Sequence, residues 1–213
     1  MNLKCCLKMS RKINQKRTPF QKVLILCEGL TEKLYLLSVK NSLPRHLQRG
    51  VRIEIDCYKK RDPKNLVKEA IRRKTKARKE GVPYSKVWIV FDHDNLPNRD
   101  FAFNKANSEK IDIAYTSMCI ELWFVIHFED NQKHFNNGDI AKKYLSDNHI
   151  KGYEPGKTNV WKEMSADNIQ RAYKNAVSIR KGKLIDIQSG VNVWDLNPYT
   201  TMDFLVRFLL ERK

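Results

Sequence analysis

The sequence lacks the features that would assign it to a zinc-binding, membrane, secreted or nucleotide-hydrolysing class. Its five cysteines are odd in number and include no CxxC pair, so neither a zinc site nor a disulfide framework is expected, and a reducing cytoplasm fits. Its apolar runs fall short of the roughly 18 residues that a membrane helix requires, so no membrane partner is expected. The N-terminal segment has no continuous apolar stretch, which argues against a secretory signal. Without a GxxxxGK[ST] loop, the chain is not expected to be a P-loop nucleotide hydrolase.

Acidic residues are scarce relative to basic ones. Lysine and arginine total 41 against 24 aspartate and glutamate residues, which gives a formal net charge of +17. Such a surplus does not determine a fold, but it favours polyanionic partners, nucleic acid first among them. The alternative is a soluble protein whose surface is simply basic. Residues 1–21 contain basic residues and no acid, so this segment is predicted to be a flexible basic arm that contacts phosphates or is merely solvated.

Strand-like and helix-like segments alternate over about the first 130 residues. Strands are predicted at 22–27, 51–58, 86–92 and 111–116, and helices at 31–40, 63–80, 101–108, 120–128, 140–146, 166–181 and 200–211. This alternation indicates an α/β fold with a parallel sheet of about four strands, flanked by helices on both faces. Residues 22–130 are predicted to form this core, and residues 131–213 a helical C-terminal extension that packs on it.

Acidic residues follow two of the predicted buried strands. Glu28 directly follows the strand at 22–27, and Asp92 and Asp94 stand at the end of the strand at 86–92. In open α/β sheets the binding crevice lies beyond the carboxyl ends of the strands, where the topology switches. We therefore expect these three carboxylates to lie close together. The alternative is that strand ends often carry acids as turn formers.

Three carboxylates in one confined site would repel one another unless they are protonated or neutralised by a cation. A hard divalent ion, Mg²⁺ or Mn²⁺, would neutralise them and take their oxygens as ligands. Asp92 and Asp94, two positions apart at a strand end, can point to the same side and bind one ion or two. Glu28 would then be a bridging ligand or a general base. Two such ions would activate a water molecule and neutralise the leaving oxygen of a phosphodiester.

Four segments resemble known sequence signatures. CEGLTEKLYL at 27–36 and FDHDN at 91–95 resemble the Glu-Gly and Asp-x-Asp signatures of the Toprim fold. More narrowly, IAYTSMCIELWFVIHF at 113–128 and NPYTTMDFLV at 197–206 resemble the RloB-type Toprim family. The resemblance covers about residues 20–210, and the ELW-x-x-x-HF segment is its most specific part.

The resemblance implies a Toprim-like (Rossmann-like) catalytic core. It also implies a metal-dependent endonuclease that hydrolyses phosphodiester bonds of nucleic acid, RNA such as tRNA or DNA, in abortive antiviral defence. By position, Glu28, Asp92 and Asp94 match the metal-binding acids of Toprim domains and are the predicted catalytic residues. Glu121 matches the family glutamate of the ELW segment and is predicted as a fourth acidic ligand or a second-metal ligand. Its alternative role is a helix N-terminal charge that complements the helix dipole.

A dense group of cations marks the predicted helix at 63–80 and the residues just before it. Residues 59–80 contain eleven lysines and arginines against three acids. We predict that this face contacts phosphates, which would confer affinity and salt dependence rather than sequence choice. A solvated helix face is the alternative. The predicted nucleic-acid-binding residues are Lys33, Arg72, Arg73, Lys76 and Lys105.

A second function is compatible with the same residues. The chain would be a non-catalytic nucleic-acid-binding or regulatory subunit that works with a partner ATPase encoded nearby, since it has no nucleotide-hydrolysing loop of its own. The two functions can coexist, because a partner can hold a nuclease inactive until it is triggered.

Overall fold

The computed structural model describes residues 21–58, 62–93, 98–130 and 134–211. These residues form a four-stranded parallel sheet flanked by helices, an α/β Rossmann-like fold, so the predicted fold class is confirmed. Asp94 and all but the last residue of the predicted basic arm at 1–21 lie outside the described residues. The predicted division of the chain at residue 130 stays a prediction.

The sheet has the strand order β2-β1-β3-β4, and every neighbouring pair is parallel. Its strands are β1 (Gln21–Cys27), β2 (Val51–Cys57), β3 (Lys86–Asp92) and β4 (Asp112–Thr116). The central pair, β1 and β3, carries the continuous apolar runs KVLILC and KVWIVFD. Such runs are typical of strands that are buried on both faces, and five successive residues of each strand are buried here.

Each predicted helical segment contains a helix, although the one predicted at 120–128 ends at Val125. The helices are α1 (Leu30–Ser42), α2 (Arg45–Gly50), α3 (Pro63–Lys79), α4 (Arg99–Ser108), α5 (Ile120–Val125), α6 (Gly138–Asn148), α7 (Ala166–Gly182), α8 (Leu184–Gln188) and α9 (Met202–Leu210), with short 3-10 turns η1 (Val160–Glu163) and η2 (Val193–Asp195). The sequence did not predict α2 or α8, which have six and five residues and therefore too few turns to display a periodicity. No helix in the described part of the chain is both long and apolar enough to cross a membrane.

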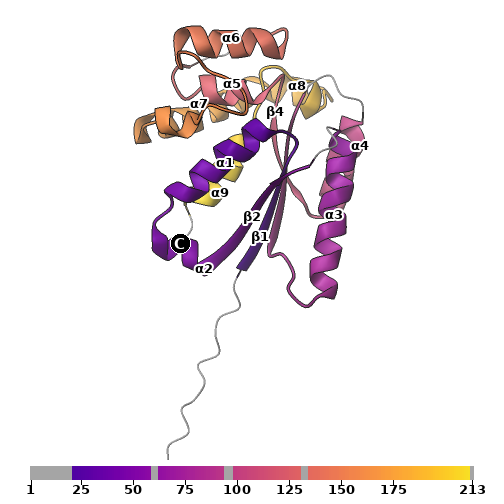
Figure 1. Ribbon diagram of the computed structural model, residues 1–213. Coiled ribbons are helices and arrows are strands. Elements are labelled where there is room, and N and C mark those ends of the chain that lie inside the picture. The colour runs from indigo at the N-terminus through magenta and orange to yellow at the C-terminus, as the bar shows by residue number, and fades with distance from the viewer. Residues whose placement is uncertain (1–20, 59–61, 94–97, 131–133, 212–213) are drawn as a thin grey trace, which may run out of the picture.

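Helices cover both faces of the sheet (Figure 1). Alternate residues of β1 belong to two separate cores. Val23 and Ile25 belong to the core under α1 and α9. Leu24 and Leu26 belong to the core under α3 and α4. Because both faces of the central strands are filled with apolar side chains, polar groups can be presented only at the strand ends.

The C-terminal segment that contains NPYTT covers the free edge of β4. Thr200 pairs with Thr116 in an antiparallel bridge, and the N–H of Thr201 donates to the β4 backbone at 2.8 Å. Asp203 at the start of α9 is buried and accepts two hydrogen bonds from Arg180 of α7, at 2.6 and 2.8 Å. The segment therefore satisfies backbone groups that an edge strand would otherwise leave open to pairing with another chain.

The boundary between β1 and β3 is the point where the path of the chain across the sheet reverses. From β1 the chain moves outward to β2, returns through α3 to β3, and continues to β4 on the other side. The helix that follows β1 (α1) and the helix that follows β3 (α4) belong to cores on opposite faces. Such a switch point opens a crevice beyond the carboxyl ends of the two strands. In Figure 1, α5, α6 and α7 lie above this edge of the sheet.

Candidate functional site

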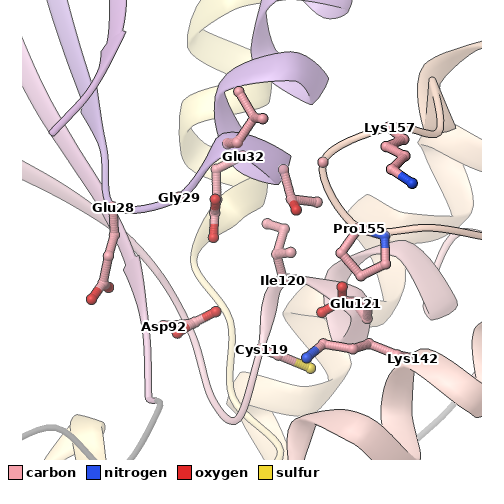
Figure 2. Close-up of a pocket in the computed structure, with 13 residues that line it drawn as sticks. Glu28, Gly29, Glu32, Asp92, Cys119, Ile120, Glu121, Lys142, Pro155 and Lys157 are labelled. Carbon is pink, nitrogen blue, oxygen red and sulfur yellow. The ribbon is translucent and has the colours of Figure 1, made fainter. Parts of the chain in front are cut away.

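A pocket of about 390 Å³ lies at this switch point, beyond the carboxyl ends of β1 and β3. The charged side chains that line it are Glu28, Glu32, Asp92, Glu121, Lys142 and Lys157. Figure 2 shows the first three on one side, which is formed by the sheet edge and α1, and the other three on the opposite side. The pocket therefore combines acids from the sheet region with an acid and two lysines from the segments that follow β4.

Glu28 stands one residue beyond β1, and its backbone is tied to both neighbouring strands. Its N–H donates to the carbonyl of Val90 in β3 at 2.9 Å, and its carbonyl accepts a hydrogen bond from the Cys57 thiol at 3.5 Å. The residue is only 6% exposed. The position of its carboxylate is therefore set by the sheet rather than by a loose loop.

Glycine at position 29 allows a second acid, Glu32, to approach the loop. A Cβ at position 29 would lie 2.5 Å from Glu32 Oε2, closer than non-bonded atoms approach. Glu32 is buried in the first turn of α1, where the positive end of the helix dipole favours a negative charge. The Glu-Gly pair thus brings two carboxylates, Glu28 and Glu32, to the same pocket.

Asp92 ends β3 and lines the same side of the pocket. In the sheet it is half-buried and pairs with Thr116 of β4. The structure therefore brings together Glu28 and Asp92, which the sequence places at the ends of two different strands. Asp94 lies outside the described residues, so the second half of the Asp-x-Asp pair stays a prediction.

Glu121 reaches the pocket from the opposite side and is held by a buried phenol. It lies in the first turn of α5, is 2% exposed, and accepts a hydrogen bond from Tyr153 Oη at 2.7 Å. Burial, followed by the negative charge of Glu121, raises the pKa of Tyr153 above its ordinary value, so the phenol remains a donor. Burial and Glu121 also raise the pKa of Cys119, which keeps that thiol protonated. Whether Glu121 is a metal ligand stays a prediction.

The oxygen donors of the pocket fit a hard divalent cation, although the described residues alone do not form a complete ligand set. All four acids of the lining present carboxylate oxygens. Within residues 21–58, 62–93, 98–130 and 134–211, no group of three or more His, Cys, Asp or Glu side chains is close enough to hold a metal ion. Mg²⁺ is commonly bound through one or two carboxylates, with waters and substrate phosphates completing its coordination. One or two of these acids would therefore be enough.

The five cations predicted to bind nucleic acid are described, and none of them lines the pocket. Each forms an ion pair within the protein. The pairs are Lys33–Asp56 (3.1 Å), Arg72–Glu69 (2.7 Å), Arg73–Asp56 (2.9 Å), Lys76–Glu80 (3.7 Å) and Lys105–Glu109 (2.8 Å). A cation that already has a carboxylate partner must share or lose it to bind a phosphate. The predicted role of these five residues in nucleic-acid binding stays a prediction.

Sequence reasoning missed three charged residues of the pocket. Glu32 had a local signal, because it lies four residues after Glu28 in the first turn of a predicted helix. Lys142 and Lys157 had none, since they belong to segments after β4 and reach the pocket only through the packing of those segments on the sheet edge.

Comparison with known proteins identifies a family. The family model described as RloB-like protein matches residues 23–209, which is most of the chain. The matched range includes every charged residue that lines the pocket. No curated protein and no solved structure gives a significant match.

Proposed function

Because this chain belongs to the RloB-like family, we propose that it is a metal-dependent endonuclease of the Toprim type. It would hydrolyse phosphodiester bonds in nucleic acid, RNA such as tRNA or DNA, with Mg²⁺ or Mn²⁺ as its metal. Its biological role would be abortive antiviral defence. The likeness of the Glu-Gly and Asp-x-Asp segments to Toprim signatures supports the reaction, and the basic composition of the chain supports the substrate class.

One observation carries this proposal: three acids from separate elements line one side of a single pocket at the switch between β1 and β3. These acids are Glu28, Glu32 and Asp92, and the first two are almost fully buried. Carboxylates crowded together away from water repel one another, which a cation relieves. A fold that retains such a cluster at its binding crevice is suited to take up a divalent cation.

The residues of the pocket would have different roles in the proposed reaction. Glu28 and Asp92, with Asp94, would hold the metal, which when bound supplies an activated water and neutralises the leaving oxygen. Glu28 is held by the sheet and is therefore placed to keep a constant geometry as a ligand or as the base that takes the proton of the attacking water. Tyr153 keeps Glu121 turned toward the pocket, where Glu121 completes the acidic lining.

Cleavage assays test this function. The purified full chain is incubated with tRNA, other RNA and plasmid DNA, in Mn²⁺, Mg²⁺ or EDTA. We expect cleavage of at least one substrate with metal and none with EDTA. Glu28→Gln should abolish it, whereas Glu163→Gln, which changes an exposed acid of η1, should not. Cleavage by Glu28→Gln at the wild-type rate would contradict the assignment.

A second function rests on a different observation: the sequence has no GxxxxGK[ST] loop, so the chain would depend on another protein for nucleotide hydrolysis. It would then be a non-catalytic or regulatory subunit that works with a partner ATPase encoded nearby. Binding of tRNA or DNA without cleavage under every metal condition, even with that partner added, would favour this second function.

A further inference from the structure

The side of the pocket opposite the sheet acids carries two lysines that are held differently. Figure 2 shows the side chain of Lys142 running from α6 toward Cys119, with its ammonium group facing the acidic side. Lys157 has a side chain that is 76% exposed, and its ammonium group pairs with the neighbouring Glu154 at 2.5 Å. Lys142 is therefore the cation that the pocket itself holds.

Helix α6 places Lys142 through its N-terminal cap and a close packing contact. Asn137 begins the helix, because its Oδ1 accepts a hydrogen bond from the N–H three residues later at 2.9 Å. Gly138 lies against Cys119: a Cβ at this glycine would lie 3.5 Å from Cys119 Cβ and 3.8 Å from Lys142 Nζ. The ammonium group is thus held one turn into α6, beside the segment that leads into Glu121.

Lys142 keeps its charge but is only weakly tethered within the protein. Its ammonium lies 3.1 Å from Asp139 Oδ1, and the side chains of Lys142 and Asp139 are 39% and 94% exposed. Ion pairs between exposed groups are weak and are screened by salt. Partial burial opposes the charge of Lys142, but the hydrogen bond to Asp139 and the negative charge of Glu121 outweigh it and raise the pKa of Lys142. A positive group thus remains available at the pocket.

A phosphodiester needs such a group. Its negative charge is repelled by carboxylates, so it can enter an acidic pocket only if cations contact its oxygens. A metal on the acids would serve the oxygens on one side. An ammonium group, a compact charge with three donors, is a common ligand for phosphate oxygens on another side.

We propose that Lys142 binds a phosphate group of the nucleic-acid strand, on the side of the pocket opposite Glu28 and Asp92. This inference rests on the proposed nuclease function and adds a phosphate-binding residue from outside the sheet. In this proposal α6 helps to orient the nucleic-acid strand over the acids of the pocket.

A merely structural role for Lys142 has a different experimental signature. If Lys142 only neutralised Glu121, its removal would change stability and leave the salt dependence of nucleic-acid binding unaltered. If it contacts a phosphate, its removal takes away one contact that releases a counterion on binding. The slope of log affinity against log salt concentration separates the two roles.

Fluorescence anisotropy measures this slope. The probes are a labelled single-stranded RNA of about 12 nucleotides and the matching DNA, titrated over a NaCl series in EDTA so that no cleavage occurs. Wild type is compared with Lys142→Ala, Lys142→Arg and Lys143→Ala. Lys143 is the matched control, because it is the next residue of α6, its side chain is 80% exposed and it pairs with Asp147 at 3.6 Å.

We expect Lys142→Ala to weaken binding about 3- to 10-fold at low salt and to reduce the magnitude of the slope by about 0.7, the value for one phosphate contact on a single strand. Lys142→Arg should retain most of the affinity because it keeps the charge. Lys143→Ala should match wild type in both measures. A slope for Lys142→Ala equal to that of Lys143→Ala overturns the proposal.

A parallel cleavage assay with Mn²⁺ on the same preparations separates this proposal from the nuclease function. If wild type binds and cleaves while Lys142→Ala behaves as Lys143→Ala, only the role of Lys142 is refuted. If wild type neither binds nor cleaves any of the nucleic acids, the nuclease function is refuted and the role of Lys142 with it. Thermal unfolding verifies that each variant is folded. If Lys142→Ala does not fold, Lys142→Gln, which keeps most of the side-chain length, replaces it.

Discussion

Two groups of acids lie near the carboxyl ends of the strands, and they differ in their surroundings. Asp56 in β2 and Glu69 in α3 are held by basic side chains of the same region. Glu28 and Asp92, at the ends of β1 and β3, line a pocket whose lysines come from segments that follow β4. The first group is held by cations of its own region, whereas the second lines a pocket.

The first group forms one network with three cations. Asp56 accepts hydrogen bonds from Lys33 at 3.1 Å and Arg73 at 2.9 Å, and Glu69 lies 2.7 Å from nitrogens of both Arg72 and Arg73. The hydrogen bond from Arg72 is the main reason that the pKa of Glu69 falls to about 2, and Arg73 adds to it against partial burial. Burial alone would raise the pKa of Asp56, but its bonds to Arg73 and Lys33 lower it.

The difference shows that an acid at a strand end does not define a site by its position alone. Asp56 and Glu28 lie near the ends of neighbouring parallel strands. Asp56 lies at the outer edge of the sheet, within reach of α3, and Glu28 lies at the switch point, where it lines the pocket. Strand order, which decides what lies beside each strand end, therefore separates a structural acid from a candidate ligand.

The largest expected difference between the two groups is in catalysis. Asp92→Asn should lower the rate of metal-dependent cleavage by about 10²–10⁴-fold, the range for losing an essential catalytic group. Asp56→Asn should cleave at close to the wild-type rate, because its partners lie within its own network. Steady-state cleavage of one substrate by both variants measures the difference. Equal losses would remove the distinction between the two groups.

A smaller loss of cleavage rate is expected from Gly29→Ala, a substitution beside the acids of the pocket. The added Cβ would lie 2.5 Å from Glu32 Oε2, so the carboxylate has to move. A displacement of about 1 Å in a site can cost up to about 10²-fold in rate. The matched control is Gly182→Ala at the end of α7, where an added Cβ meets nothing within 4 Å. If Gly29→Ala cleaves as fast as Gly182→Ala, Glu32 has no part in the site.

Metal addition should stabilise the protein through the pocket group only. A ligand that binds the folded state at 100 times its Kd adds about 2.7 kcal/mol to the free energy of unfolding. Titration of Mn²⁺ should therefore raise the thermal unfolding midpoint of wild type and of Asp56→Asn, and raise that of Asp92→Asn much less. A differential scanning fluorimetry series without nucleic acid measures this. Identical shifts for the two variants would place the metal elsewhere.

The smallest effect is expected for the stability of the folded state at acid pH. It should come from the first group of acids, Asp56 and Glu69. The pKa of Glu69 is lowered from its ordinary 4.5 to about 2. A depressed carboxylate pKa stabilises the folded state above the unfolded-state pKa, and this contribution disappears as the pH falls from about 4.5 toward about 2. After allowance for solvent screening it is about 1–2 kcal/mol.

Denaturant unfolding of wild type and Glu69→Gln at several pH values measures this contribution. The difference in the free energy of unfolding should be largest near neutral pH and shrink below pH 4.5, as the carboxylate becomes protonated. Glu163→Gln provides the control, because it changes an exposed acid and should show no such trend. A difference between wild type and Glu69→Gln that does not vary with pH would contradict the prediction.

The fold was predictable where the signals are local. The apolar runs of β1 and β3 correspond to strands that are covered on both faces, and Asp62 before Pro63 begins α3 by accepting hydrogen bonds from two backbone N–H groups at 3.3 Å. The short helices α2 and α8 were missed, because five or six residues make too few turns to show a period; α5 is equally short and was predicted only as part of a longer segment, 120–128. The family was recognised through the ELW-x-x-x-HF and NPYTT segments, and the family match confirms it.

The NPYTT segment shows what resemblance alone leaves open. The sequence connects it with a family, but its contacts reveal a structural task, because Thr200 and Thr201 cover the edge of β4 and Asp203 is held by Arg180. Glu121, in the other family segment, lines the pocket instead. Two segments that resemble the same family thus have different contacts, and only the structure distinguishes them.

By itself, the sequence determined the strands, the long helices, the family and the presence of acids at several strand ends. These properties depend on neighbouring residues, which the order of the chain keeps together. Only the tertiary structure decided that Glu28 and Asp92 share a pocket with Glu32 and Glu121, that Asp56 is neutralised by Lys33 and Arg73, and that Lys142 faces the acids. Those outcomes follow from strand order and from the packing of α6 against α5, which join residues far apart in the chain and leave no local pattern to detect.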